Sequence, residues 1–119
     1  MTDQIRVGVG DGRLVVETTP VTGVTTDDYA VAYSANLQWA ADTVIVIANT
    51  GDTNSLDYDV RVYSHYLSGN PYTLTTNTVV HNDSDEIILV RHAKVEVRVK
   101  STSGGAHTTF QITSIAGRS

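Results

Sequence analysis

The sequence of 119 residues contains no cysteine, which excludes disulfide bonds, thiolate nucleophiles and metal sites built on sulfur. No stretch approaches the roughly 20 consecutive apolar residues that a membrane-spanning helix requires. The N-terminus, Met1-Thr2-Asp3-Gln4, lacks the basic start and the apolar core of a secretion signal. We therefore expect a protein that is made in the cytosol, has no membrane partner and depends on burial and hydrogen bonding for its stability.

Positive charge is also scarce, with 8 Lys and Arg against 13 Asp and Glu and a net charge of -5. This balance argues against nucleic acid as a partner, because a phosphate backbone requires a basic surface. The charge is unevenly distributed. Residues 1–86 carry three basic and twelve acidic side chains, a net -9, and residues 87–119 carry five basic and one acidic, a net +4. The acidic and basic parts must meet, either within the fold or between subunits.

What the sequence has in excess is β-forming residues: 17 Val, 7 Ile and 17 Thr make up about a third of the chain. Branched side chains suit a pleated sheet better than a helix, so we expect little or no helix. The length fits one core, since domains commonly have roughly 100–150 residues.

The first 28 residues differ from the rest. Two short alternating runs, 4–9 and 13–18, are joined by Gly10-Asp11-Gly12, a pattern that predicts a hairpin. The Thr-rich residues 21–28 contain few large apolar groups and indicate an arm or linker. We therefore divide the chain into an N-terminal hairpin or arm, 1–28, and a β-sandwich domain, 29–119.

Within the sandwich domain, residues 43–48 are apolar on both faces, which favours a central strand covered on both sides. Residues 29–39 give only a weak strand pattern. Further strands are expected over 57–66, 72–80, 86–90, 93–100 and 108–115. Seven or more short strands separated by turn residues predict an all-β fold, an antiparallel sandwich or a small barrel.

The side-chain patterns of two of these strands predict how they pair with each other. Residues 57–66 and 91–100 can be laid antiparallel so that the numbers of each opposed pair sum to 157. One face then carries three charge pairs and the other face three apolar pairs, which are Asp57–Lys100, Asp59–Arg98, Arg61–Glu96, Tyr58–Val99, Val60–Val97 and Val62–Val95. A slip of one residue would send the apolar side chains to the wrong face. The pairing skips two intervening strands, as in a Greek key, and so favours a sandwich.

No motif indicates catalysis, a cofactor or a metal. The four histidines, His65, His81, His92 and His107, do not occur at ligand spacing and are interpreted as surface or turn residues. The carboxylates could bind calcium, but Asp57 with Asp59, and Asp83 with Asp85 and Glu86, do not follow a calcium-loop pattern. The sequence contains no G-x-S-x-G elbow, and the glycines at 8–12 precede neither Gly-Lys-Ser nor a helix. We expect no enzyme activity.

Aromatic residues leave one binding hypothesis open. Tyr63, His65 and Tyr72 could line a sugar-binding or protein-binding face, while core packing is the alternative for the six tyrosines. Open strand edges are a second possibility, because unpaired strand backbone must be covered or used to pair with another chain.

Two segments carry a resemblance to known families. The stretch from Thr43 to Gly51, with its Asn49-Thr50-Gly51 turn, and the alternating 57–63 resemble immunoglobulin-like adhesion modules. The later run Val95-Glu96-Val97-Arg98-Val99-Lys100-Ser101, continued through Gly104 to Ile112, resembles small virion proteins of tailed viruses, notably capsid decoration proteins. The resemblance implies an immunoglobulin-like antiparallel β-sandwich, made in the host cytoplasm, that adds itself to a capsid or tail lattice of the virion.

The leading hypothesis is a capsid decoration or cement protein that binds the major capsid or another virion protein and forms a homo-oligomer. Its subunit interface would use the apolar positions of the N-terminal arm, Ile5, Val7, Val9, Leu14 and Val16. One alternative is a filament or pilus-like subunit whose arm completes the sheet of the next subunit. Another is a carbohydrate-binding module that exposes its tyrosines and Trp39 as one flat strip.

Overall fold

The computed structural model describes residues 4–7, 14–17, 20–36, 42–63, 70–90 and 94–118. Every regular element in this part of the chain is a strand, and none is a helix. The strands are β1 (Gln4–Val7), β2 (Leu14–Glu17), β3 (Val21–Val24), β4 (Ala30–Asn36), β5 (Asp42–Asn49), β6 (Leu56–Tyr63), β7 (Tyr72–Val79), β8 (Ser84–Val90), β9 (Lys94–Ser101) and β10 (Thr109–Arg118). The all-β prediction is confirmed.

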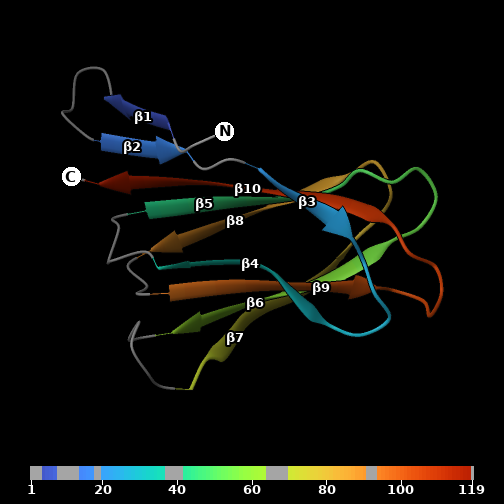
Figure 1. Ribbon diagram of the computed structural model, residues 1–119. Helices are drawn as coiled ribbons and strands as arrows, with labels where there is room; N and C mark the ends of the chain where they lie inside the picture. Colours follow the sequence, from blue (N-terminus) through green and yellow to red (C-terminus); the bar gives the residue numbers. More distant parts are fainter. Residues whose placement is uncertain are drawn as a thin grey trace.

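The strands form two antiparallel sheets that pack face to face (Figure 1). The six-stranded sheet has the order β1-β2-β10-β5-β8, and β3 also pairs with β10. The four-stranded sheet has the order β4-β9-β6-β7. The predicted antiparallel sandwich with an N-terminal hairpin is therefore confirmed.

The strand order refines the comparison with immunoglobulin-like domains. Strands β3 to β10 form two four-stranded arrays, β3-β10-β5-β8 and β4-β9-β6-β7. This is the order of an eight-stranded jelly roll. An immunoglobulin constant-type domain instead has sheets of four and three strands. The two share packed antiparallel layers, but the connections between the layers differ.

The core lies between the two sheets and consists of alternate residues of the central strands. Ile45 and Ile47 on β5 have no solvent exposure, and the same is true of Val60 on β6 and Val97 on β9. Two hydroxyl contacts cross the core: Tyr33 Oη lies 2.6 Å from Ser114 Oγ, and Tyr58 donates to Asp85 at 2.8 Å.

Strand β5 corrects one prediction. It is central in its sheet, between β10 and β8, but only the residues facing the other sheet are fully buried. Val44 and Val46, which point outward, are half-buried. The apolar run 43–48 is therefore covered on one side by the second layer, and the expected cover on both sides is wrong.

The predicted register of β6 and β9 is confirmed at every position. Asp57 pairs with Lys100, Asp59 with Arg98 and Val60 with Val97, as the sum of 157 requires. Arg98 Nε donates to Asp59 Oδ1 at 3.0 Å, and its Nη2 donates to the second carboxylate oxygen. Two strands lie between them in sequence: β7 pairs with the other side of β6, and β8 pairs with β5 in the six-stranded sheet. The predicted crossover between sheets is therefore also present.

The predicted hairpin is present, but the predicted linker is not. Strands β1 and β2 pair with each other, and β2 continues onto β10. Residues 21–28 were expected to be an arm, yet β3 pairs with β10 and Thr25 is buried. Backbone hydrogen bonds to β10 hold this segment in the sheet. The linker was predicted from the small number of large apolar side chains, which does not reveal such pairing. The division of the chain at residue 28 stays a prediction.

One glycine makes the close packing of β3 possible. A Cβ atom added to Gly23 would lie 2.7 Å from the Phe110 ring, which is buried beneath the strand. Glycine at this position therefore lets β3 lie over the aromatic ring that fills this end of the core.

Candidate functional site

Asp57 and Asp85, two of the carboxylates considered as calcium ligands, have structural partners. Asp57 accepts hydrogen bonds from Thr78 and Thr102, both at 2.7 Å. Asp85 accepts from Tyr58 and Asn77. In the described part of the chain, no group of three or more His, Asp or Glu side chains is placed to hold a metal ion. These carboxylates connect strands.

Burial affects the tyrosine that reaches across the core. It raises the pKa of the Tyr58 hydroxyl well above its ordinary value, and the hydrogen bond to Asp85 adds to the increase. The phenol is therefore a persistent donor to the Asp85 carboxylate. This contact ties β6 of one sheet to β8 of the other.

One cluster has the residue types of a catalytic triad. The Nδ1 atom of His107 lies 2.9 Å from Ser101 Oγ, and its Nε2 atom lies 3.9 Å from Asp27 Oδ1. Ser101 is only 1% exposed, and its hydroxyl also contacts Thr25 at 2.8 Å. A substrate cannot reach a hydroxyl in this position, so the cluster connects the loops and does not form a nucleophile. Of the other histidines, His81 is exposed in a turn, while His65 and His92 lie outside the described residues.

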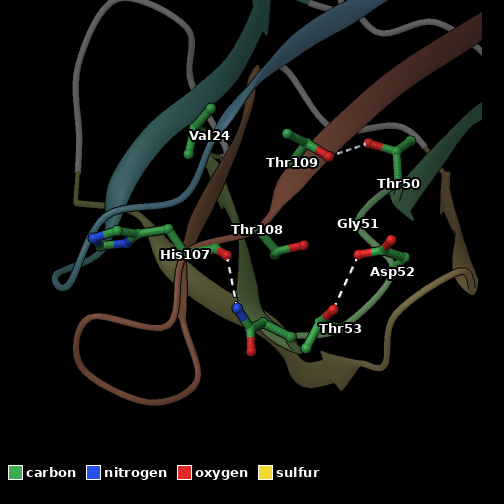
Figure 2. Close-up of a pocket in the computed structure, with 9 residues that line it drawn as sticks. Val24, Thr50, Gly51, Asp52, Thr53, His107, Thr108 and Thr109 are labelled. Carbon is green, nitrogen blue, oxygen red and sulfur yellow. Dashed lines mark hydrogen bonds between the residues drawn. The ribbon is translucent and has the colours of Figure 1, made fainter.

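A polar pocket of about 470 Å³ lies beside this cluster, at one end of the sandwich (Figure 2). Its lining residues are Val24, Thr50, Gly51, Asp52, Thr53, Asn54, His107, Thr108 and Thr109. Many of its polar groups bond one another: Thr50 donates to Thr109 at 2.8 Å, and the Asn54 amide donates to the His107 carbonyl at 3.0 Å. Among the described residues that line it, His107 has the one aromatic ring, so this lining offers little surface for stacking against a sugar.

The buried side chain of Asn49 supports the floor of this pocket. Its Nδ2 atom donates to the carbonyls of Asn54 and Val79, at 2.8 and 3.0 Å. Its Oδ1 atom accepts from Gly51 N at 3.1 Å and from Thr108 Oγ1 at 2.7 Å. The Asn-Thr-Gly turn of the sequence is thus a structural junction of three loops.

The described tyrosines do not form one flat strip. Tyr33 and Tyr58 belong to the core. Tyr63 donates to Glu96 at 3.0 Å and has the Lys94 ammonium 4.9 Å from its ring. Tyr29 lies against Arg98, and Tyr72 is half-exposed. Core packing is confirmed for the two buried tyrosines, while His65 and Trp39 lie outside the described residues.

The sheet edges offer the better candidate surface, and two of the edge strands, β4 and β7, are irregular. In β4, Ala32 is an extra residue between the pairs Val31–Arg98 and Tyr33–Val97. In β7, Leu74 is an extra residue between the pairs formed by Thr73 and Thr75. Such bulges interrupt the backbone ladder, and proteins use them to keep edge strands from pairing with other chains.

Strand β8 is the regular edge. It pairs with β5 at every residue from Ser84 to Val90 without a register shift, and among the described strands it has no partner on its other side. Asn49 N donates to the Asp83 carbonyl at 2.9 Å, and this bond shows which alternate residues of β8 form backbone hydrogen bonds with β5. Backbone groups of Asp85, Ile87 and Leu89 therefore face β5, and those of Glu86, Ile88 and Val90 face the open edge.

The edge of β8 also exposes apolar side chains. Ile88 is 62% exposed, and it is opposite Val44 of β5, which is in turn opposite Ile115 of β10. These three residues form an outward row across the sheet, and Ile115 is 40% exposed. Sequence reasoning did not single out this strand, although the change from acidic to basic residues falls within it, after Glu86.

The predicted interface residues lie at the opposite edge of the same sheet. Ile5 and Val7 are in β1, and Leu14 and Val16 are in β2. Val9 lies outside the described residues. The register brings Val16 opposite Ala116 of β10, so the hairpin extends the chain's own sheet. Its use as a subunit interface stays a prediction.

No protein-family model matches the sequence, and no curated protein matches it either. Solved structures do share the fold. A chain from Bacillus endospore appendages, described as disulfide-linked pili, matches with a TM-score of 0.57 and 14% identity, over 98% of this chain and 99% of its own. The SPBc2 prophage-derived protein YomS matches with a TM-score of 0.51 and 13% identity, over 84% and 96% of the two chains.

A third structure with this fold is the K3 adhesin domain of Lys-gingipain from Porphyromonas gingivalis. It matches with a TM-score of 0.54 and 11% identity, over 96% of this chain and 78% of its own. At such identities the likeness shows the fold. No helix long and apolar enough to cross a membrane is found in the described residues.

Proposed function

We propose that this chain is a non-enzymatic structural subunit whose copies join into a fibre. The arrangement of the sheet edges carries the proposal. Strands β1 and β8 are the two ends of the path through the six-stranded sheet, and β8 is regular and partly apolar. The edge strands of the other sheet both carry bulges. Subunits that join at two opposite edges of one sheet grow in one dimension.

The similarity to an appendage chain supports this proposal, because it extends over nearly the whole of both chains. That protein is described as forming disulfide-linked pili. The present chain has no cysteine, so its copies would be held by backbone pairing and apolar contact alone. Such a fibre would be insensitive to reducing agents but sensitive to denaturants.

The second candidate is the virion protein of the sequence hypothesis, a capsid decoration protein whose partner is the major capsid protein and whose location is the virion. The similarity to a prophage-derived protein favours it. The jelly-roll order is also common in viral capsid domains. A glycan-binding adhesion module has less support, because the described tyrosines form no common strip.

Electron microscopy of the purified protein separates these candidates. A concentration series examined by negative stain and light scattering should give filaments in the absence of any capsid, and reducing agent should not dissolve them. Monomers that bind only to capsids would favour the decoration protein. Monomers that form neither polymers nor capsid complexes would refute both.

The N-terminal hairpin offers a direct test of the predicted interface residues, Ile5, Val7, Val9, Leu14 and Val16. Deletion of residues 1–20 should abolish growth of the fibre, because it removes the β1 edge. It should leave a folded subunit, because strands β3 to β10 keep the complete jelly roll and every fully buried apolar residue of the described core. Circular dichroism and light scattering measure the two properties. Assembly at the full-length level would exclude the hairpin as an interface.

A further inference from the structure

We propose that two copies of the chain pair through β8, antiparallel, about a twofold axis at Ile88. The inference rests on the proposed self-assembly and names one of its contacts. In this arrangement Ile88 lies opposite Ile88 of the partner subunit. Glu86 then lies opposite Val90 of the partner subunit, and Ile87 opposite Leu89 of the partner subunit. The two six-stranded sheets become one continuous sheet.

The backbone geometry of β8 fits this arrangement. Its outward donors and acceptors belong to Glu86, Ile88 and Val90, because the alternate residues bond β5. In the proposed register each of these residues faces another from the same set. Each opposed pair can therefore exchange two backbone hydrogen bonds without disturbing the β5 ladder.

The start of β8 selects this register over a shifted one. Asp83 Oδ1 accepts a hydrogen bond from Ser84 N at 2.8 Å, so the backbone donor of Ser84 is already satisfied. An axis at Ile87 would set Ser84 opposite Val90 of the partner subunit. Ser84 N would then have to donate to the partner subunit and would lose its hydrogen bond to Asp83. An axis at Ile88 leaves the Asp83 cap intact.

The charge pattern of β8 selects the antiparallel direction. Its first half carries Asp85 and Glu86, and its second half is apolar from Ile87 to Val90. A parallel, in-register pair would place Glu86 beside its own copy, and like charges directly opposite are destabilising. The antiparallel pair sets the acidic halves at opposite ends. The next residue in the sequence after Val90 is Arg91, so the chain changes from acidic to basic across this strand.

Apolar burial adds to the pairing. The outward row of Ile115, Val44 and Ile88 ends at the open edge, where Ile88 is 62% exposed. About the proposed axis this row continues into the same row of the second copy. A second copy is therefore the occupant that matches both the shape and the residue types of this edge.

Cysteine substitution tests the register directly, because the natural chain has no thiol. Ile88→Cys should give a dimer on oxidation or with a short bifunctional thiol reagent, since opposed residues have Cα atoms about 5.5 Å apart, within disulfide range. Glu86→Cys alone and Val90→Cys alone should give no crosslinked dimer. In each case the two introduced cysteines lie four residues apart along the paired strands. A mixture of these two variants should crosslink to at least ten times the level of either alone.

Thr76→Cys is the matched control, since Thr76 is an exposed residue of the bulged edge strand β7. It should form no disulfide-linked dimer under the same oxidation. Crosslinking of Ile87→Cys in place of Ile88→Cys would overturn the register. Equal crosslinking of Thr76→Cys would overturn the choice of edge.

Electron microscopy of the same samples separates this inference from the proposed function. Filaments without a crosslink at residue 88 would overturn the β8 pairing while self-assembly stands. Absence of both filaments and dimers would refute the proposed self-assembly and the β8 pairing together. Ile88→Pro provides a second variant, because it removes only an outward backbone donor and spares the β5 ladder. It should stay folded and lose the dimer, and a Pro variant that still dimerises would refute the pairing.

Discussion

The strongest prediction for stability concerns Asn49, whose side chain is 1% exposed and connects three loops. Its amide nitrogen donates to two carbonyls, and its amide oxygen accepts from Gly51 N and Thr108 Oγ1. Asn49→Ala would remove all four hydrogen bonds. The loop that contains Asn54 and the strand that ends at Val79 would lose their shared anchor.

The expected cost follows from those contacts. A buried hydrogen bond contributes roughly 1 kcal/mol, and a buried group left without a partner costs about 1–3 kcal/mol. Two carbonyls, one backbone N–H and the Thr108 hydroxyl lose a partner here, so we expect Asn49→Ala to reduce the free energy of unfolding by about 4 kcal/mol. That is a large part of the total for a domain, about 5–15 kcal/mol.

Urea unfolding followed by far-ultraviolet circular dichroism measures this effect. With a urea dependence near 2 kcal/mol/M, the midpoint should fall by about 2 M. Asn77→Ala is the control, because Asn77 is exposed and its amide donates to Asp85 at the surface. The control should change the free energy of unfolding by less than about 1 kcal/mol. A similar small change for Asn49→Ala would refute the reasoning.

Two further predictions concern packing and pH. Gly23→Ala should cost about 1–3 kcal/mol in urea unfolding, because its Cβ would lie 2.7 Å from Phe110, whereas Gly104→Ala, with nothing within 4 Å, should be neutral. Tyr58 has a pKa raised above 10.0 by burial and by Asp85, so above pH 10 the unfolded chain releases a proton that the folded chain keeps, and stability falls as pH rises. Tyr58→Phe should make that decline shallower, and an unchanged pH profile would contradict the assignment.

Much of the local structure could be predicted from the sequence. The alternation of residues 57–63 and 94–100 sets which side chains face the core, and three opposed charge pairs then select one register, which the structure confirms. The Gly10-Asp11-Gly12 turn predicted the hairpin of β1 and β2. These patterns depend on a strand period of two and on turn chemistry, both of which are local.

The candidate site was harder to predict. The sequence of β8 does not show that it is an edge strand. Whether a strand lies at an edge depends on how the other strands of the sheet pair. The bulges at Ala32 and Leu74 depend on the partner strands too, since a bulge is defined by an extra residue relative to a neighbour.

The sequence by itself determined that this chain is an all-β sandwich, where most of its strands lie and how β6 meets β9. Only the tertiary structure decided that the layers follow a jelly-roll order, that Val21–Val24 is a strand and that the outward valines of β5 are half-exposed. The physical reason is that a side-chain pattern selects a strand and its buried face, whereas the neighbour of a strand depends on hydrogen bonds and burial contributed by distant residues.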